Sequence, residues 1–138
     1  MSYIPITTSA GYTPQSAVSA SRSLSAAAAT TVVDVTEAGI VESIVIETTS
    51  AIAVSCTATL KFTIDGSASS SRTVISGTTF QDWVLACPGN GDGSVNNDRR
   101  MLPITFPYSE SLKVEAECTV AGVGAGTLKV TVLRSKSV

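Results

Sequence analysis

The segment with the densest set of oxygen-bearing side chains is 88–98, PGNGDGSVNND, in which such side chains recur at every second position around a glycine. They are Asn90, Asp92, Ser94, Asn96 and Asp98. A calcium loop needs about six or seven oxygen ligands, including a carboxylate at its first and twelfth positions. With Gly93 at position six, those end positions are Pro88 and Arg99. The sequence therefore predicts a long polar turn, with cation binding as the alternative.

Arg99 and Arg100 follow this turn as the only adjacent pair of basic residues. A cationic pair beside a long loop suggests contact with a partner protein.

Catalytic chemistry has few candidate residues in this chain. The sequence contains no histidine, which removes histidine-based triads, the usual imidazole base and most catalytic zinc or iron sites. A glycosidase needs two inward-facing carboxylates about 5–10 Å apart. Asp82 with Asp92 or Asp98 is the alternative left open, but nothing in the sequence marks a pair. We therefore expect a protein that is not an enzyme.

The cysteines and glycine-rich segments predict no cofactor or metal site. Cys56, Cys87 and Cys118 form no CxxC pair, and no histidine can activate their thiols. We expect them to be reduced and buried. The glycine-rich segments 89–93 and 121–126 lack the Lys-Ser/Thr of a phosphate loop and precede no predicted helix.

Composition points to a binding or structural module. Charged residues make up 14 %, against about 25 % in an average domain, and Ser and Thr number 20 and 18. The formal charge is −2, with no basic cluster that would attract nucleic acid. No run of apolar residues is long enough to span a membrane, and the N-terminus lacks the pattern of a signal peptide. We expect synthesis without export and no membrane partner.

Residues 1–30 differ from the rest of the chain, being rich in Ser, Ala and Thr with Arg22 as the only charge. Their large side chains are Tyr3, Ile4, Ile6, Tyr12, Val18 and Leu24. These are too few to offset an ordering entropy of about 1–2 kcal/mol per residue. The segment is predicted to be an extended arm that is either a loose tail or docks on a neighbouring subunit. A short helix over 15–29 is an alternative, because alanine favours helices.

From residue 31 onward the apolar residues recur with a period of two, which is typical of half-buried strands. The clearest predicted strands are 57–65, 111–120 and 126–134. Weaker strands are predicted at 31–36, 40–47, 72–76, 79–86 and 103–107.

Eight short strands without a helical pattern predict an all-β domain over residues 31–138, an antiparallel sandwich or barrel whose count fits a jelly roll. Asp65-Gly66 and the glycines of 89–93 supply turns. Segment 121–126 is interpreted as a hairpin connection.

The few aromatic residues are needed mainly for the core, including Phe62, Phe80 and Phe106. An exposed ring can also stack on a pyranose. Trp83, Tyr108 and Phe106 are therefore the candidates for an alternative function in glycan or receptor binding.

Four segments carry a family resemblance: GIVESIVIETTS (39–50), ATLKFTIDG (58–66), LPITFPYSESLKVEAE (102–117) and GTLKVTVLRSK (126–136). In this pattern the sequence from Gly39 onward resembles the small jelly-roll modules of tailed-bacteriophage virions, such as capsid decoration (cement) proteins. The resemblance covers roughly 100 residues and specifies a fold more than a task.

The resemblance implies a virion structural protein, made in the host cytoplasm, that stabilises the phage head by bridging capsid subunits. Its implied partners are the major capsid protein or other virion subunits, together with further copies of itself in a trimer or another symmetric cluster. A position in the tail or at a fibre attachment is an alternative, because the Ser/Ala-rich arm is unusually long. The residues expected to contact partners are Tyr3, Ile4, Ile6, Tyr12, Leu24, Arg99 and Arg100.

Overall fold

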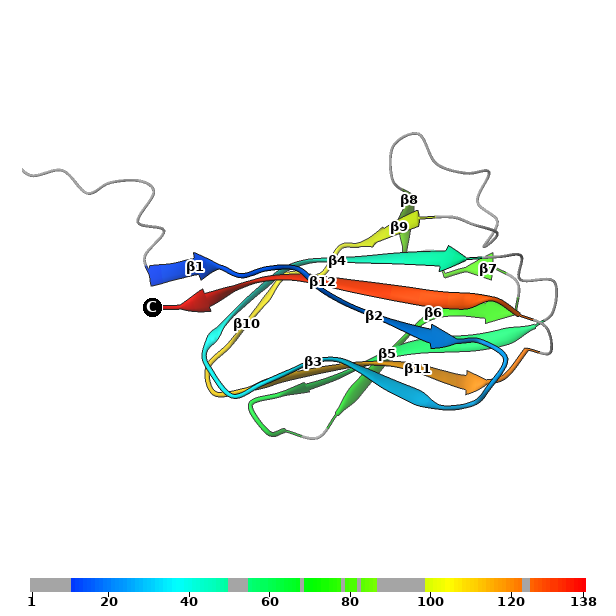
Figure 1. Ribbon diagram of the computed structural model, residues 1–138, viewed down its shortest axis with the longest axis horizontal. Helices are drawn as coiled ribbons and strands as arrows, with labels where there is room; N and C mark the ends of the chain where they lie inside the picture. Colours follow the sequence, from blue (N-terminus) through cyan, green and yellow to red (C-terminus); the bar gives the residue numbers. More distant parts are fainter. Residues whose placement is uncertain are drawn as a thin grey trace, which may run out of the picture.

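The computed structural model describes residues 11–49, 55–67, 69–77, 79–81, 83–86, 99–122 and 125–138. Within these residues the chain forms two antiparallel sheets packed face to face (Figure 1). Sheet A contains β1 (Tyr12–Pro14), β2 (Val18–Ser23), β4 (Gly39–Thr49), β8 (Leu85–Ala86), β9 (Arg99–Leu102), β10 (Phe106–Tyr108) and β12 (Thr127–Ser137). Sheet B contains β3 (Ala29–Val35), β5 (Cys56–Ile64), β6 (Ser70–Gly77), β7 (Thr79–Phe80) and β11 (Leu112–Val120). The predicted all-β sandwich is confirmed.

The strand order is that of a jelly roll. Sheet A runs β2-β12-β4-β9. In addition, β1 pairs with the C-terminal end of β12, and β10 pairs with the N-terminal end of β4. Sheet B runs β3-β11-β5-β6. When β1 and β10 are counted with the strands that they extend, and the two-residue strands β7 and β8 are set aside, the two sheets hold eight principal strand positions. Because β2, β3, β4 and β5 alternate between the sheets, hydrophobic faces from distant parts of the sequence meet in one core.

The period-two pattern correctly assigns the inner faces of the central strands. Leu60 and Phe62 of β5 are at most 5 % exposed, and the same alternation buries Val114 of β11 and Val130 of β12. Phe62 from sheet B meets Phe106 from sheet A edge to face, with ring centroids 5.8 Å apart. Each fully buried side chain of this size stabilises the fold by about 1.5–3 kcal/mol.

The segment expected to be an arm contributes two strands to sheet A. β2 pairs with β12 from Val18 opposite Val132 to Ser23 opposite Thr127, and β1 pairs with the last residues of β12. Leu24 is fully buried. The sandwich therefore includes residues on the N-terminal side of the predicted boundary at residue 31. Backbone pairing with β12 outweighs the helix propensity of the alanines, so 18–23 is a strand and not part of a helix.

The connection at 121–126 is not a hairpin, so that interpretation is corrected. β11 is paired on both edges within sheet B, and β12 is paired on both edges within sheet A. The connection therefore crosses between sheets. A Cβ atom on Gly122 would lie 2.9 Å from the carbonyl oxygen of Ser55, so glycine permits this close passage.

Two predicted strands are divided or displaced. Residues 79–86 supply β7 and β8, which belong to different sheets, and the strand predicted at 103–107 begins at Phe106.

β9 was not predicted, because one of its inward-facing residues is Arg100, which hides the apolar alternation. Val120 is 54 % exposed, since a register shift between Cys118 and Val120 interrupts the alternation.

Candidate functional site

The outer face of sheet A carries a row of apolar side chains. Met101 of β9 stands opposite Leu85 of β8 on one side and Val45 of β4 on the other. Leu85 is 49 % and Met101 42 % exposed, whereas Val45 is only 6 % exposed. Leu133 of β12 is 38 % exposed and stands opposite Ser43, diagonally from Val45. We call Leu85, Met101, Val45 and Leu133 the sheet A patch.

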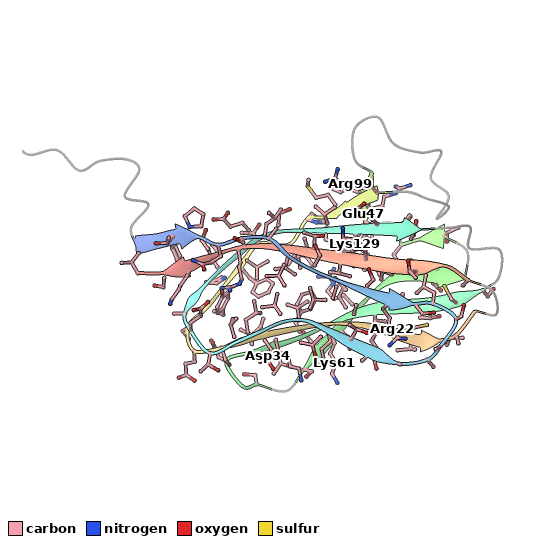
Figure 2. All side chains as sticks on the ribbon, in the orientation of Figure 1. Arg22, Asp34, Glu47, Lys61, Arg99 and Lys129 are labelled. Carbon is pink, nitrogen blue, oxygen red and sulfur yellow. The ribbon has the colours of Figure 1, made fainter. Side chains whose placement is uncertain are left out.

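A row of charged residues borders the sheet A patch. Glu47 of β4 stands between Arg99 of β9 and Lys129 of β12, as the labelled side chains in Figure 2 show. Thr131 of β12 stands opposite Val45 on the side away from Met101, and its hydroxyl shares a hydrogen bond of 2.7 Å with the hydroxyl of Ser19 on β2. The outer face of sheet A thus offers an apolar strip that has a charged row along one side and two hydroxyls at one end, an arrangement suited to contact with another macromolecule.

The outer face of sheet B has a different character. Lys113 lies opposite Asp34, and Glu115 lies opposite Lys61. The Lys113 ammonium is 3.6 Å from the Glu115 carboxylate, and the Thr59 hydroxyl donates to Glu117 over 3.5 Å. These groups favour hydration, so this face is the weaker candidate for dry contact.

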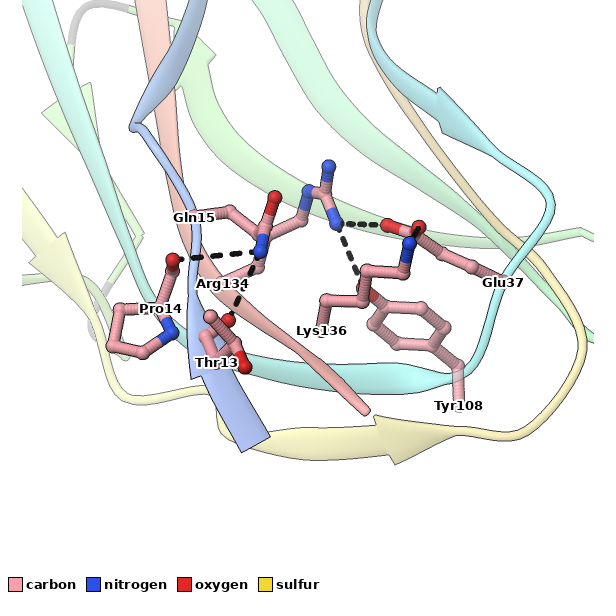
Figure 3. A network of polar contacts seen from close by, with 7 residues as sticks. All are labelled: Thr13, Pro14, Gln15, Glu37, Tyr108, Arg134 and Lys136. Carbon is pink, nitrogen blue, oxygen red and sulfur yellow. Dashed lines mark hydrogen bonds and ion pairs between the residues drawn. The ribbon is translucent and has the colours of Figure 1, made fainter. Parts of the chain in front are cut away.

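An ion network closes one end of the sandwich (Figure 3). Arg134 Nη1 donates to Glu37 Oε1 over 2.5 Å and to the Tyr108 hydroxyl over 3.3 Å. Lys136 Nζ lies 3.4 Å from Glu37 Oε2. The bond from Arg134, reinforced by Lys136, holds the pKa of Glu37 below its ordinary value. The Arg134 side chain is only 10 % exposed, so the network has a structural role joining β12 to the β3–β4 connection.

Asp65 fixes the loop between β10 and β11. Its carboxylate accepts bonds from the backbone N–H groups of Ser109, Glu110 and Ser111 and from the Ser109 hydroxyl, over 2.7–3.2 Å. These bonds, led by the one from the Glu110 backbone, lower its pKa to about 2. Asp65 and Gly66 both have positive φ, as the predicted turn requires. Asp65 therefore acts as a cap for this loop.

An open depression of about 340 Å³ lies beside this cap. It is lined by Tyr12, Ala38, Gly39, Asp65, Pro107, Tyr108, Ser109 and Ser137. Gly39 is required there, because a Cβ would lie 2.5 Å from the Tyr108 hydroxyl. Asp65 already accepts four protein hydrogen bonds, and the other polar side chains of the lining are the hydroxyls of Tyr12, Tyr108, Ser109 and Ser137.

Those residues predicted to bind partners that the structure describes do not form one site. Tyr12 is 39 % exposed on β1, and Arg99 is exposed beside the sheet A patch. Leu24 and Arg100 are buried within this chain, and the Arg100 guanidinium lies 4.8 Å over the Phe80 ring. These two residues pack the sandwich itself, which corrects their assignment to a partner surface. Tyr3, Ile4 and Ile6 lie outside the described residues.

The aromatic candidates for glycan binding are engaged inside the protein. Trp83 Nε1 donates to the Thr73 carbonyl over 2.9 Å, and the Arg72 guanidinium lies 4.5 Å over the Trp83 ring. Tyr108 is 3 % exposed, and Phe106 packs against the core. None of the three presents a free ring face of the kind that stacks on a sugar.

The described cysteines are buried thiols. Burial raises the pKa of both Cys56 and Cys118, so each stays protonated and unreactive near neutral pH. Cys87 and the candidate calcium loop 88–98 lie outside the described residues. Among the residues that are described, no three His, Cys, Asp or Glu side chains gather to hold a metal ion. The same part of the chain contains no helix long and apolar enough to cross a membrane.

Sequence reasoning missed the sheet A patch. Met101 and Leu85 belong to strands of four and two residues, too short for a period to be read. The available signal was Leu133, which falls on the polar phase of the predicted strand 126–134. An apolar residue out of phase on an amphipathic strand indicates an exposed contact.

No protein-family model matches the chain, and a search of curated proteins finds no match.

Proposed function

We propose that this chain is a structural protein of a virus particle, most simply a capsid decoration protein that attaches to the major capsid protein or another virion subunit. The observation that carries the proposal is the sheet A patch, which exposes apolar side chains beside a charged row and neutral hydroxyls. The proposed role is mechanical: added contacts lower the free energy of the assembled shell relative to its separate subunits.

The physical basis is the ease with which this face can be dehydrated. Burying Leu85 and Met101 removes apolar surface from water, at roughly 25 cal/mol per Å². Hydroxyls such as those of Ser19 and Thr131 lose little on burial when they keep hydrogen bonds, whereas an ion can cost several kcal/mol. Arg99, Glu47 and Lys129 would then select the orientation of a partner with complementary charges.

A tail or fibre adaptor would use the same face, so its position in the particle is a matter for experiment. The glycan-binding alternative is not carried forward, because Trp83, Tyr108 and Phe106 are packed within the sandwich.

The test is attachment to virus particles purified from the source culture and freed of this chain. Met101→Asp should weaken attachment by at least about tenfold, since it places a charge in the centre of the contact. Ser71→Asp is the matched control, because Ser71 is an exposed residue opposite Lys61 on the outer face of sheet B. Co-sedimentation measures both.

Equal attachment of the two variants, with melting temperatures like that of the parent, would refute the sheet A patch as the contact. Failure to find the chain in purified particles by mass spectrometry would refute the virion assignment itself.

A further inference from the structure

The edge of β2 offers unused main-chain hydrogen-bonding groups. Among the described residues β2 pairs only with β12, and Leu24 N donates to Gly126 O in the same register. Because bonded and non-bonded pairs alternate along an antiparallel ladder, the N–H and C=O groups of Ser19, Ser21 and Ser23 point away from β12.

Of these three serines, Ser19 and Ser21 have outward main-chain groups that make no hydrogen bond with the described residues. The Ser23 carbonyl accepts a bond of 3.2 Å from Arg22 Nε, and Arg22 Nη1 donates to the Thr30 hydroxyl. The Arg22 guanidinium therefore lies at the Ser23 end of the edge and not at Ser19 or Ser21. Ser19 and Ser21 have small, exposed side chains that leave their main chain accessible.

The other described edge strands have features that hinder pairing with a further strand. β1 and β10 are three residues long and contain Pro14 and Pro107, and β7 and β8 have two residues each. β3 has a register shift that skips Val32. The edge of β6 is covered where Trp83 donates to the Thr73 carbonyl. Within the described part of the chain, β2 is thus the long regular edge without such protection.

We propose that two copies of this chain pair antiparallel through β2, about a two-fold axis that places Ala20 opposite Ala20 of the second copy. Ser19 then stands opposite Ser21 of the second copy. Since both residues direct N–H and C=O groups outward, the two symmetric pairs form four hydrogen bonds and continue sheet A across the dimer.

The occupant is a second copy because the strand is complementary to itself in this register. Val18 falls opposite Arg22 of the second copy, so no like charges meet, and small side chains fill the centre. A register centred on Ser21 is disfavoured, because it places Ser19 opposite Ser23, whose carbonyl already accepts from Arg22. This dimer goes beyond the proposed attachment to a particle and uses the edge of β2 rather than the sheet A patch.

Sedimentation of the purified full chain over a range of concentrations tests the pairing. A monomer–dimer equilibrium is expected, and Ser21→Pro should raise its dissociation constant at least about tenfold by removing an outward N–H from each copy. The same N–H makes no bond to β12, so the variant should keep its circular dichroism spectrum. Ser21→Thr, which retains the N–H, should dimerise like the parent.

Cross-linking tests the register. In a Cys87→Ser background, Ala20→Cys places two thiols across the two-fold axis, where oxidised glutathione should convert them to an intermolecular disulfide. Val18→Cys is the matched control on the same face of β2, about four residues of strand away from its symmetry mate. Selective cross-linking of Ala20→Cys supports the proposal.

A chain that remains monomeric, a three-fold assembly, or equal cross-linking at both positions would overturn the dimer. None of these results bears on attachment through the sheet A patch, which Met101→Asp tests separately.

Discussion

The two outer faces of the sandwich are built on the same strand geometry but present opposite surfaces. Sheet A exposes Leu85 and Met101 beside the buried Val45, while the centre of sheet B carries Lys61 opposite Glu115. The inner faces, by contrast, are mainly apolar, with the buried Arg100 as an exception. Alternation therefore determines which side chains reach the core, but the residues on the outward phase decide whether a face stays hydrated or can be covered.

The largest expected effect lies at the centre of the sheet A face. Val45 is 6 % exposed between Met101 and Thr131. Val45→Asp places a carboxylate in this covered position and should lower the free energy of unfolding by about 2–4 kcal/mol. Chemical denaturation measures the change.

The matched substitution on sheet B should have little effect. Lys61→Val places an apolar side chain at a central outward position and should change the free energy of unfolding by less than about 0.5 kcal/mol. If the two substitutions destabilise the protein equally, the contrast between the faces is wrong.

An intermediate effect is expected at the Asp65 cap, which joins the turn after β5 of sheet B to the loop leaving β10 of sheet A. Its folded pKa of about 2 lies below its ordinary value of 3.8. The carboxylate's contribution to the free energy of unfolding is therefore fully present at a pH above the ordinary pKa of 3.8, and it is lost as the pH falls toward 2.

Asp65→Asn keeps a residue that tolerates positive φ but removes the charge. The variant should be less stable than the parent at neutral pH, and the two should converge in acid. Unfolding measured from neutral pH down to about pH 2 checks this. A stability difference that is independent of pH would show that the carboxylate's charge is irrelevant.

A small effect is also expected among the other charges of sheet B. Glu115→Gln removes the partner of Lys113, 3.6 Å away, and should lower the free energy of unfolding by less than about 1 kcal/mol. The loss should disappear in 1 M salt, where the Debye length is about 3 Å. Persistence of the full effect at high salt would mean that Glu115 acts through packing.

The central strands could be predicted from sequence because their periodicity is strong. Leu60 and Phe62 alternate with Thr and Lys, and the buried positions of β11 and β12 follow the same rule. β2 could not be recognised, because its inward side chains include Ala20 and Arg22 and therefore lack an apolar period. The crossing at 121–126 depends on which strands flank β11 and β12, which local sequence does not encode.

The candidate surface was less predictable than the fold. Its members come from β4, β8, β9 and β12, and only strand register makes them neighbours. Sequence adjacency was misleading for Arg99 and Arg100: consecutive residues of a strand face opposite sides, so one is exposed and the other is buried over Phe80.

The burial of Leu24 fixes how the beginning of this chain can be manipulated. Cutting at residue 30 would remove β2, expose one side of β12 and leave a leucine-sized void in the hydrophobic interior. Such a truncated protein would be expected to aggregate, and loss of its activity would say nothing about docking. Affinity tags and fluorescent fusions therefore belong ahead of Gly11, and deletions meant to probe the leading segment should stop there.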